Sequence, residues 1–144
     1  MKKTSVLYFY ICSIIFLLAG CAKELSVEQG KSFIPATGSL KDSNGLCMGT
    51  IVHGTYYNGV TPGSDTCYAE VIVDVATAGT YKIYTNVVNG FMFSDSGFFD
   101  TPGIDTIRLL VSGTPILNLP SDFALFFDTS VCAFTVNVLD STGH

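Results

Sequence analysis

The sequence has few basic residues and almost no histidine, and these shortages exclude several classes of protein. Lys and Arg number 7, against 12 Asp and Glu, and there are 2 His. A chain this acidic offers no positive surface for phosphate groups. We therefore expect no nucleic acid partner. No C-x-x-C pair is present, and His53 and His144 stand far from any pair of cysteines. We therefore expect no zinc site.

Motifs that carry catalysis are also missing. The sequence has no G-x-S-x-G, and His53 lies in the strand-like stretch I-V-H-G-T-Y, where a histidine is ordinarily structural. Asp95, Asp100 and Asp105 follow one another through turn regions, but no D-x-D-x-D-G calcium loop surrounds them. Turn aspartates usually accept hydrogen bonds from their own backbone. We expect a protein that is not an enzyme, with no catalytic residue, cofactor or metal.

No helical period is sustained after residue 46, and the apolar residues there alternate with polar ones. Such alternation predicts half-buried strands of an antiparallel sheet. The inward sets are Ala69, Val71, Val73 and Val75; Tyr81, Ile83 and Thr85; Ile107, Leu109 and Val111; and Phe134, Val136 and Val138.

Glycine-containing turn pairs such as Asn58-Gly59, Asn89-Gly90 and Pro102-Gly103 separate these strands at short intervals. The pattern predicts one all-β domain over residues 46–140, an antiparallel β-sandwich of about seven strands, followed by a tail at 141–144.

The N-terminus has no apolar run long enough to span a membrane comfortably. Lys2 and Lys3 precede an apolar run of about fourteen residues, whereas a spanning helix needs roughly 20. The run ends in Leu18-Ala19-Gly20-Cys21, which resembles the lipobox of bacterial lipoproteins. That resemblance implies that residues 1–20 are removed as a signal peptide and that Cys21 carries acyl chains such as palmitate. The alternative is an ordinary secretory signal that ends near a cysteine.

Removal of the signal peptide makes the chain more acidic. Lys2 and Lys3 leave while every acidic residue stays, so the net charge becomes 5 − 12 = −7. We therefore expect the membrane link to come from the acyl chains at Cys21 and not from a basic patch. Residues 21–45 are rich in Ser, Gly and Lys and predict a flexible tether. The alternative for this segment is an extra edge strand through Ser32–Ala36.

Residues 47–139 resemble the short Ig-like repeats of exported and lipid-anchored proteins of Bacteroidota. The resemblance rests on G-T-Y-Y-N-G at 54–59, A-G-T-Y-K-I-Y-T-N at 78–86, V-N-G-F-M-F-S at 88–94, V-S-G-T-P at 111–115 and C-A-F-T-V-N-V at 132–138. It implies an Ig-like sandwich without enzymatic activity. With the lipobox, it implies a protein anchored by lipid in the outer membrane, on the periplasmic face or the cell surface.

The cysteines of the mature chain allow one disulfide. The similar repeats imply a bridge between Cys47 and Cys132, joining the first strand to the start of the last. Cys67 is two residues before Ala69, so alternation along the strand places both side chains on the inner face. This predicts a buried thiol at Cys67. A Cys67–Cys132 bridge is the alternative.

Two functions fit these features. The first is a binding or adhesion module that contacts a glycan or protein ligand. The second is a structural or accessory subunit of an envelope assembly, docked through outward apolar side chains. The side chains expected to form this interaction surface are Tyr68, Ile72, Tyr84, Leu110 and Phe126.

The stretch V-V-N-G-F-M-F at 87–93 predicts a hairpin with a type I′ turn at Asn89-Gly90. If the alternation that places Ile83 inside continued unbroken through the hairpin, Phe91 and Phe93 would be exposed. One extra residue near Asn86 reverses which face the later side chains occupy. We expect such a bulge, with Phe91 and Phe93 inside; without it, both rings would form an exposed binding tip.

Overall fold

The computed structural model describes residues 34–143. The signal peptide and the lipidation predicted at Cys21 lie outside the described residues. The strands are β1 (Thr37–Ser39), β2 (Thr50–His53), β3 (Tyr56–Tyr57), β4 (Tyr68–Thr77), β5 (Gly79–Thr85), β6 (Phe91–Phe99), β7 (Gly103–Gly113), β8 (Pro120–Phe127) and β9 (Ser130–Leu139), followed by a 3₁₀ turn, η1 (Ser141–Gly143).

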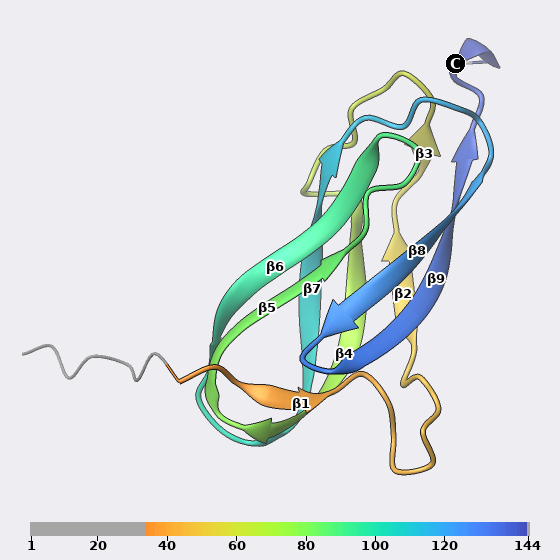
Figure 1. The fold of residues 1–144 in the computed structure, drawn as a ribbon. Helices are drawn as coiled ribbons and strands as arrows, with labels where there is room; N and C mark the ends of the chain where they lie inside the picture. Colours follow the sequence, from red (N-terminus) through yellow and green to blue (C-terminus); the bar gives the residue numbers. More distant parts are fainter. Residues whose placement is uncertain (1–33, 144) are drawn as a thin grey trace, which may run out of the picture. The chain divides into compact units, whose positions relative to one another are not determined.

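The all-β prediction is confirmed, with more strands than expected. Seven strands have four or more residues, and β1 and β3 add two shorter ones. They form one curled sheet in the order β1-β4-β7-β6-β5-β8-β9-β3, with β2 also paired to β4 (Figure 1). All named pairs are antiparallel except β3 with β9. The hydrogen bonding is thus continuous and does not separate two sheets.

The curl is closed where the chain passes from β2 to β3. β2 pairs with β4 near one edge of the sheet, whereas β3 pairs with β9 at the other edge. Gly54 makes this switch with φ +85, and a Cβ there would lie 2.7 Å from the Cys67 sulfur. Both the positive φ and the close approach favour glycine. One short segment therefore joins the two ends of the sheet.

The core contains the inward positions that alternation predicts on β4, together with an aromatic cluster. Ala69, Val71 and Val73 are fully buried. Phe93 of β6 contacts Phe123 of β8 at 5.3 Å between ring centroids, edge to face, and Phe134 of β9 at 5.5 Å. These contacts hold β8 and β9 across the core from β6, and each buried ring contributes roughly 1.5–3 kcal/mol.

The predicted bulge near Asn86 is confirmed. β5 and β6 pair in one register up to Tyr84 with Ser94, but Val88 pairs with Phe91, so the β5 side carries one extra residue. At this point Asn86 bonds to β8, since its N–H donates to the Ala124 carbonyl at 3.2 Å. Phe91 and Phe93 are buried as a result. The turn at Asn89-Gly90 has φ of 50 and 83, as a type I′ turn requires.

The prediction that the tether extends to residue 45 is wrong for residues 34–45. β1 pairs with β4, and Ala36 N–H donates to the Thr80 carbonyl at 2.7 Å. Ala36 and Leu40 are buried. The alternative of an edge strand is closer to the structure, although the strand lies at Thr37–Ser39. Two buried residues in a polar segment give no periodic signal, and their partners are distant in sequence.

Candidate binding surfaces

Four of the five predicted surface residues lie in one row across the outside of the sheet. Strand register pairs each member with the next, and the row, which we call the outer row, runs through His53, Tyr68, Leu110, Ser94, Tyr84, Phe126 and Val131. Tyr84, Leu110 and Val131 are exposed. The prediction of Tyr68, Tyr84, Leu110 and Phe126 as an interaction surface stays a prediction, but the structure brings them together.

The rings of the outer row are stacked, which fixes their positions. Tyr68 stacks on His53 at 4.4 Å, and the Arg108 guanidinium lies 3.9 Å from the Tyr68 ring centroid. Tyr84 stacks on Phe126 at 5.4 Å. Each of these rings is partly covered by its neighbours, since Lys82 Nζ also lies 5.4 Å from the Tyr84 ring centroid. The outer row therefore offers a ligand only part of each ring.

Ile72, the fifth predicted residue, lies apart from the outer row. It is four residues beyond Tyr68 on β4 and lines a shallow surface groove of about 380 Å³. The groove is lined by Met48, Gly49, Thr50, Ile51, Glu70, Ile72 and Thr106. The Glu70 carboxylate is already occupied, because it lies 3.2 Å from His53 Nε2.

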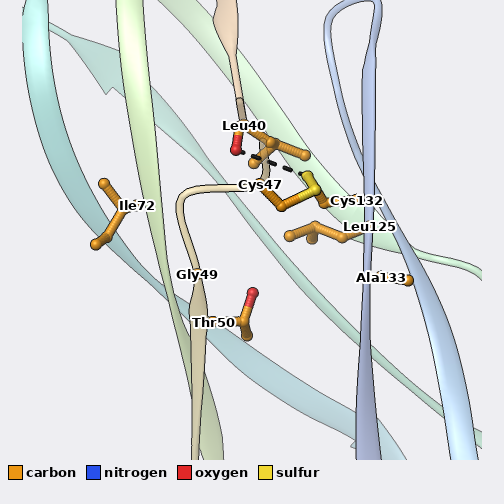
Figure 2. A pocket seen from close by; sticks show the side chains of 8 residues that line it. All are labelled: Leu40, Cys47, Gly49, Thr50, Ile72, Leu125, Cys132 and Ala133. Atoms are coloured by element: carbon orange, nitrogen blue, oxygen red, sulfur yellow. Dashed lines mark hydrogen bonds between the residues drawn. A yellow bond between two sulfur atoms is a disulfide. The ribbon is translucent and has the colours of Figure 1, made fainter. Parts of the chain in front are cut away.

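A disulfide joins Cys47 to Cys132, the pairing that the resemblance implied, with Cα atoms 5.9 Å apart. It crosses the gap between the β1–β2 loop and β9, and a cavity of about 30 Å³, large enough for a water, lies beside it (Figure 2). The Leu40 carbonyl oxygen lies 3.6 Å from Cys132 Sγ.

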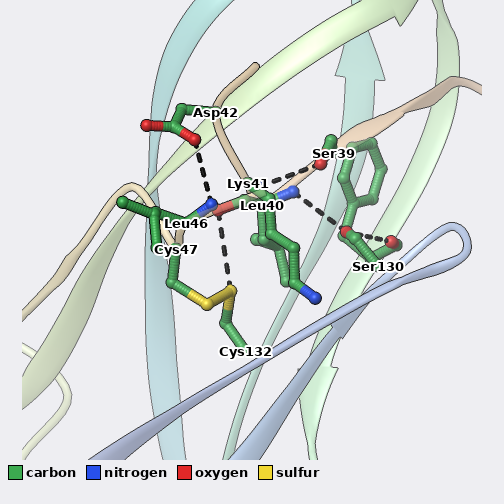
Figure 3. Close-up of a disulfide and its surroundings, with 9 residues drawn as sticks. Ser39, Leu40, Lys41, Asp42, Leu46, Cys47, Ser130 and Cys132 are labelled. Carbon is green, nitrogen blue, oxygen red and sulfur yellow. Dashed lines mark hydrogen bonds between the residues drawn. A yellow bond between two sulfur atoms is a disulfide. The ribbon is translucent and has the colours of Figure 1, made fainter. Parts of the chain in front are cut away.

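Hydrogen bonds hold the loop that carries Cys47. Leu40 N–H donates to Ser130 Oγ at 2.9 Å, which ties the loop to the β8–β9 turn, and the Leu46 amide donates to Asp42 at 2.9 Å (Figure 3). The disulfide and these bonds close the sheet at this end, as the β3–β9 pairing closes it at the other.

Cys67 is a free, buried thiol, as its parity predicts. The nearby Tyr56 is 2% exposed, and its hydroxyl has no hydrogen-bond partner. Burial raises the pKa of Tyr56, and the charge of a Cys67 thiolate would raise it further. The phenol is therefore neutral, and the pair has no access to solvent for nucleophilic chemistry.

No group of three or more metal-ligating side chains occurs within residues 34–143. His53 is occupied by Glu70 on one side and by the Tyr68 ring on the other. The expectation that Asp95 and Asp105 lie in turns is wrong, because they lie in β6 and β7, whose strands continue through these positions. Asp105 accepts a hydrogen bond from the Thr106 amide at 2.7 Å, and Asp95 accepts one from the Tyr81 hydroxyl at 2.7 Å.

A second apolar surface, which the sequence analysis missed, lies on loops at one end of the molecule. The β3–β4 loop, the β5–β6 turn and the β7–β8 loop meet there (Figure 1). Their aliphatic side chains are 40–67% exposed, and we call this group the loop tip: Val60, Val87, Ile116, Leu117 and Leu119. One sequence feature indicates this surface: the run T-P-I-L-N-L-P at 114–120 is uncharged and apolar but does not alternate as a strand does.

Asn89 ties the loop tip together. Its side-chain oxygen accepts from the Leu117 amide at 2.8 Å, and its side-chain nitrogen donates to the Leu117 carbonyl at 2.7 Å. Gly59 N–H donates to the Pro115 carbonyl at 2.7 Å, which fastens the β3–β4 loop to the same site. The exposed aliphatic side chains therefore stand on fixed backbone, and little conformational entropy would be lost on binding.

No protein-family model matches the chain, and no curated protein or solved structure matches it either. Among the residues that the structure describes, no helix has the length and apolar character needed to cross a membrane.

Proposed function

We propose that this protein is a lipoprotein of the bacterial envelope that acts as a binding or adhesion module without enzymatic activity. The lipobox-like Leu18-Ala19-Gly20-Cys21 supports an acyl anchor, and the Ig-like resemblance supports export to the outer membrane. The observation that carries the binding role is the loop tip, where fixed loops expose aliphatic side chains to solvent.

The position of the loop tip suits a module held at its N-terminal end. Ile34, the first described residue, hydrogen bonds to Thr80 at the start of β5, whereas Val87 follows the end of β5. The loop tip is therefore at the opposite end of the domain from Ile34. A tethered domain of this shape would present the loop tip away from its membrane.

A second function is a structural or accessory subunit that docks sideways inside an envelope assembly. The outer row favours this role, because Tyr84, Leu110 and Val131 are exposed along the flank of the sheet. A flank contact would also leave the loop tip free.

Accessibility on intact cells separates the two functions. The full chain would carry an epitope tag after His144, because the described C-terminus lies at the loop-tip end (Figure 1). We expect antibody to stain intact cells, and we expect Cys21→Ser to release the protein from the membrane fraction. A tag that is reached only after the outer membrane is opened would contradict an adhesin and favour the accessory subunit.

A further inference from the structure

We propose that the loop tip binds the loop tip of a second copy of this chain, so that the protein is a homotypic adhesin. This inference rests on the proposed function and names its partner. The loop tip consists of Val60, Val87, Ile116, Leu117 and Leu119, on three loops joined by hydrogen bonds.

The distribution of charge favours a second copy approaching at this end. Residues 34–143 contain 3 basic and 10 acidic side chains, a net charge of 3 − 10 = −7, so two copies repel each other. The segments 57–61, 86–92 and 112–121 contain no charged residue. The acids nearest to these segments in sequence are Asp122, Asp95 and Asp65. Asp65 lies in the β3–β4 loop, where its backbone carbonyl accepts a hydrogen bond from the Arg108 guanidinium at 3.1 Å. Contact between loop tips therefore carries the smallest electrostatic cost.

The opposite end of the domain is acidic. Asp74 pairs with Ser39 of β1, Asp100 lies in the β6–β7 turn, and the Asp128 carboxylate accepts a hydrogen bond from Gly38 N–H at 3.2 Å. Charges separated by more than about 8 Å are largely screened at physiological ionic strength. Copies that meet at their loop tips keep these acids far apart.

The chemistry of the loop tip disfavours a sugar or a lipid headgroup. The rings of Phe91 and Tyr56 next to the loop tip are buried, so neither of them is available for stacking on a sugar. No Lys or Arg is present in the three loops to attract an anionic headgroup. An uncharged aliphatic surface is complementary to another surface like itself, which is the requirement of a two-fold symmetric contact.

The size of the surface predicts a weak contact that becomes strong in arrays. Five aliphatic side chains provide less area than the roughly 800 Å² per partner of a standard stable interface. A single pair would therefore separate readily in solution. Many copies on two facing membranes would bind together through effective concentration. Because the loop tip is opposite Ile34, copies anchored in facing membranes can meet there.

The test uses the full chain in neutral phosphatidylcholine vesicles, with flotation to verify that protein and vesicles stay together. We expect wild-type vesicles to aggregate, measured by light scattering. Ile116→Asp and Val87→Asp, on different loops of the tip, should slow aggregation at least about tenfold. Ile104→Asp is the matched control, because Ile104 is 66% exposed, Ile116 is 65% exposed, and Ile104 pairs with Asp74 far from the loop tip.

A mixing experiment identifies the occupant. Vesicles carrying Ile116→Lys and vesicles carrying Ile116→Asp should each aggregate slowly, whereas their mixture should aggregate at a rate near wild type. Wild-type vesicles that float with protein but do not aggregate would overturn the inference, as would equal rates for Ile116→Asp and Ile104→Asp. If the tag is nevertheless exposed on intact cells, the adhesin proposal survives with a different partner.

Discussion

The hydroxyl groups of Tyr56 and Tyr81 are held in opposite ways, although both rings pack in or against the core. The Tyr56 hydroxyl is buried without a partner. The Tyr81 hydroxyl donates to Asp95 at 2.7 Å, and burial together with this bond raises the pKa of Tyr81. A buried polar group without a partner opposes folding, whereas a satisfied one contributes modestly.

We therefore expect Tyr56→Phe to leave the free energy of unfolding unchanged or to raise it by about 1 kcal/mol. Tyr81→Phe, the matched control, should lower it by about 0.5–1.5 kcal/mol because the bond to Asp95 is lost. Urea unfolding followed by far-UV circular dichroism measures both. A clear loss of stability in Tyr56→Phe would show that its hydroxyl has a partner, such as a bound water.

Single residues show what alternation can predict. Parity placed Val71 and Val73 inside and Tyr84 and Leu110 outside, because period two is a local property of a strand. Parity could not show that Ile72 lies apart from the outer row, since that depends on the register between strands. It also missed Ala36 and Leu40, which are bonded to residues distant in sequence, Thr80 of β5 and Ser130 of β9.

At the scale of elements, the bulge between β5 and β6 is stabilised by hydrogen bonds of one buried side chain, Thr85. Thr85 is 2% exposed, and its Oγ1 accepts from the Phe93 amide at 3.0 Å where the register changes. The same hydroxyl donates to the Asn86 carbonyl at 2.9 Å. The side chain thus replaces a ladder bond that the extra residue has removed.

We expect Thr85→Val to lower the free energy of unfolding by about 1–3 kcal/mol, because it leaves the buried Phe93 amide unpaired while keeping the shape of the side chain. Thr77→Val at the exposed end of β4 should change it by less than about 0.5 kcal/mol. Urea unfolding gives the values, and hydrogen exchange at the Phe93 amide should quicken in Thr85→Val alone. Unchanged exchange there would contradict the assigned role of Thr85.

The bulge could be predicted because two local patterns conflicted. The alternation that places Ile83 inside would put Phe91 outside, whereas the alternation within the second strand places Phe91 inside. β1 and β3 could not be predicted, because three and two residues are too few to show a period. Nor could the sequence show that β2 and β3 pair with opposite edges of the sheet. Gly54 marks the point where the chain passes from one edge of the sheet to the other, but a glycine between strands ordinarily indicates a turn.

At the scale of the whole molecule, the loop tip shows why binding surfaces are harder to predict than cores. The residues of the tip come from three loops that are distant in sequence, and a pattern within one loop cannot show that the others join it. Asn89 was recognisable as a turn residue, but its bonds to Leu117 depend on the path of the β7–β8 loop.

Closure of the curled sheet depends on few links, and this makes the disulfide important for global stability. Only Tyr56 and Tyr57 pair β3 with β9. Cys47 and Cys132 are 85 residues apart in sequence, so their bridge restricts most of the unfolded domain. The chain-entropy relation gives about 4–5 kcal/mol for a loop of this length.

We therefore expect the double variant Cys47→Ala with Cys132→Ala to lower the free energy of unfolding by about 4–5 kcal/mol. The rate of amide hydrogen exchange should rise most on β9, beside the gap that the disulfide no longer closes. Cys67→Ala is the control: it removes a buried thiol, keeps the bridge, and should cost about 1 kcal/mol. Urea unfolding with and without reductant measures both, and reductant should affect wild type and Cys67→Ala but not the double variant. A double variant within about 1 kcal/mol of wild type would mean that the curl is closed by the β2–β3 switch and the aromatic core alone, and that the bridge adds little to either.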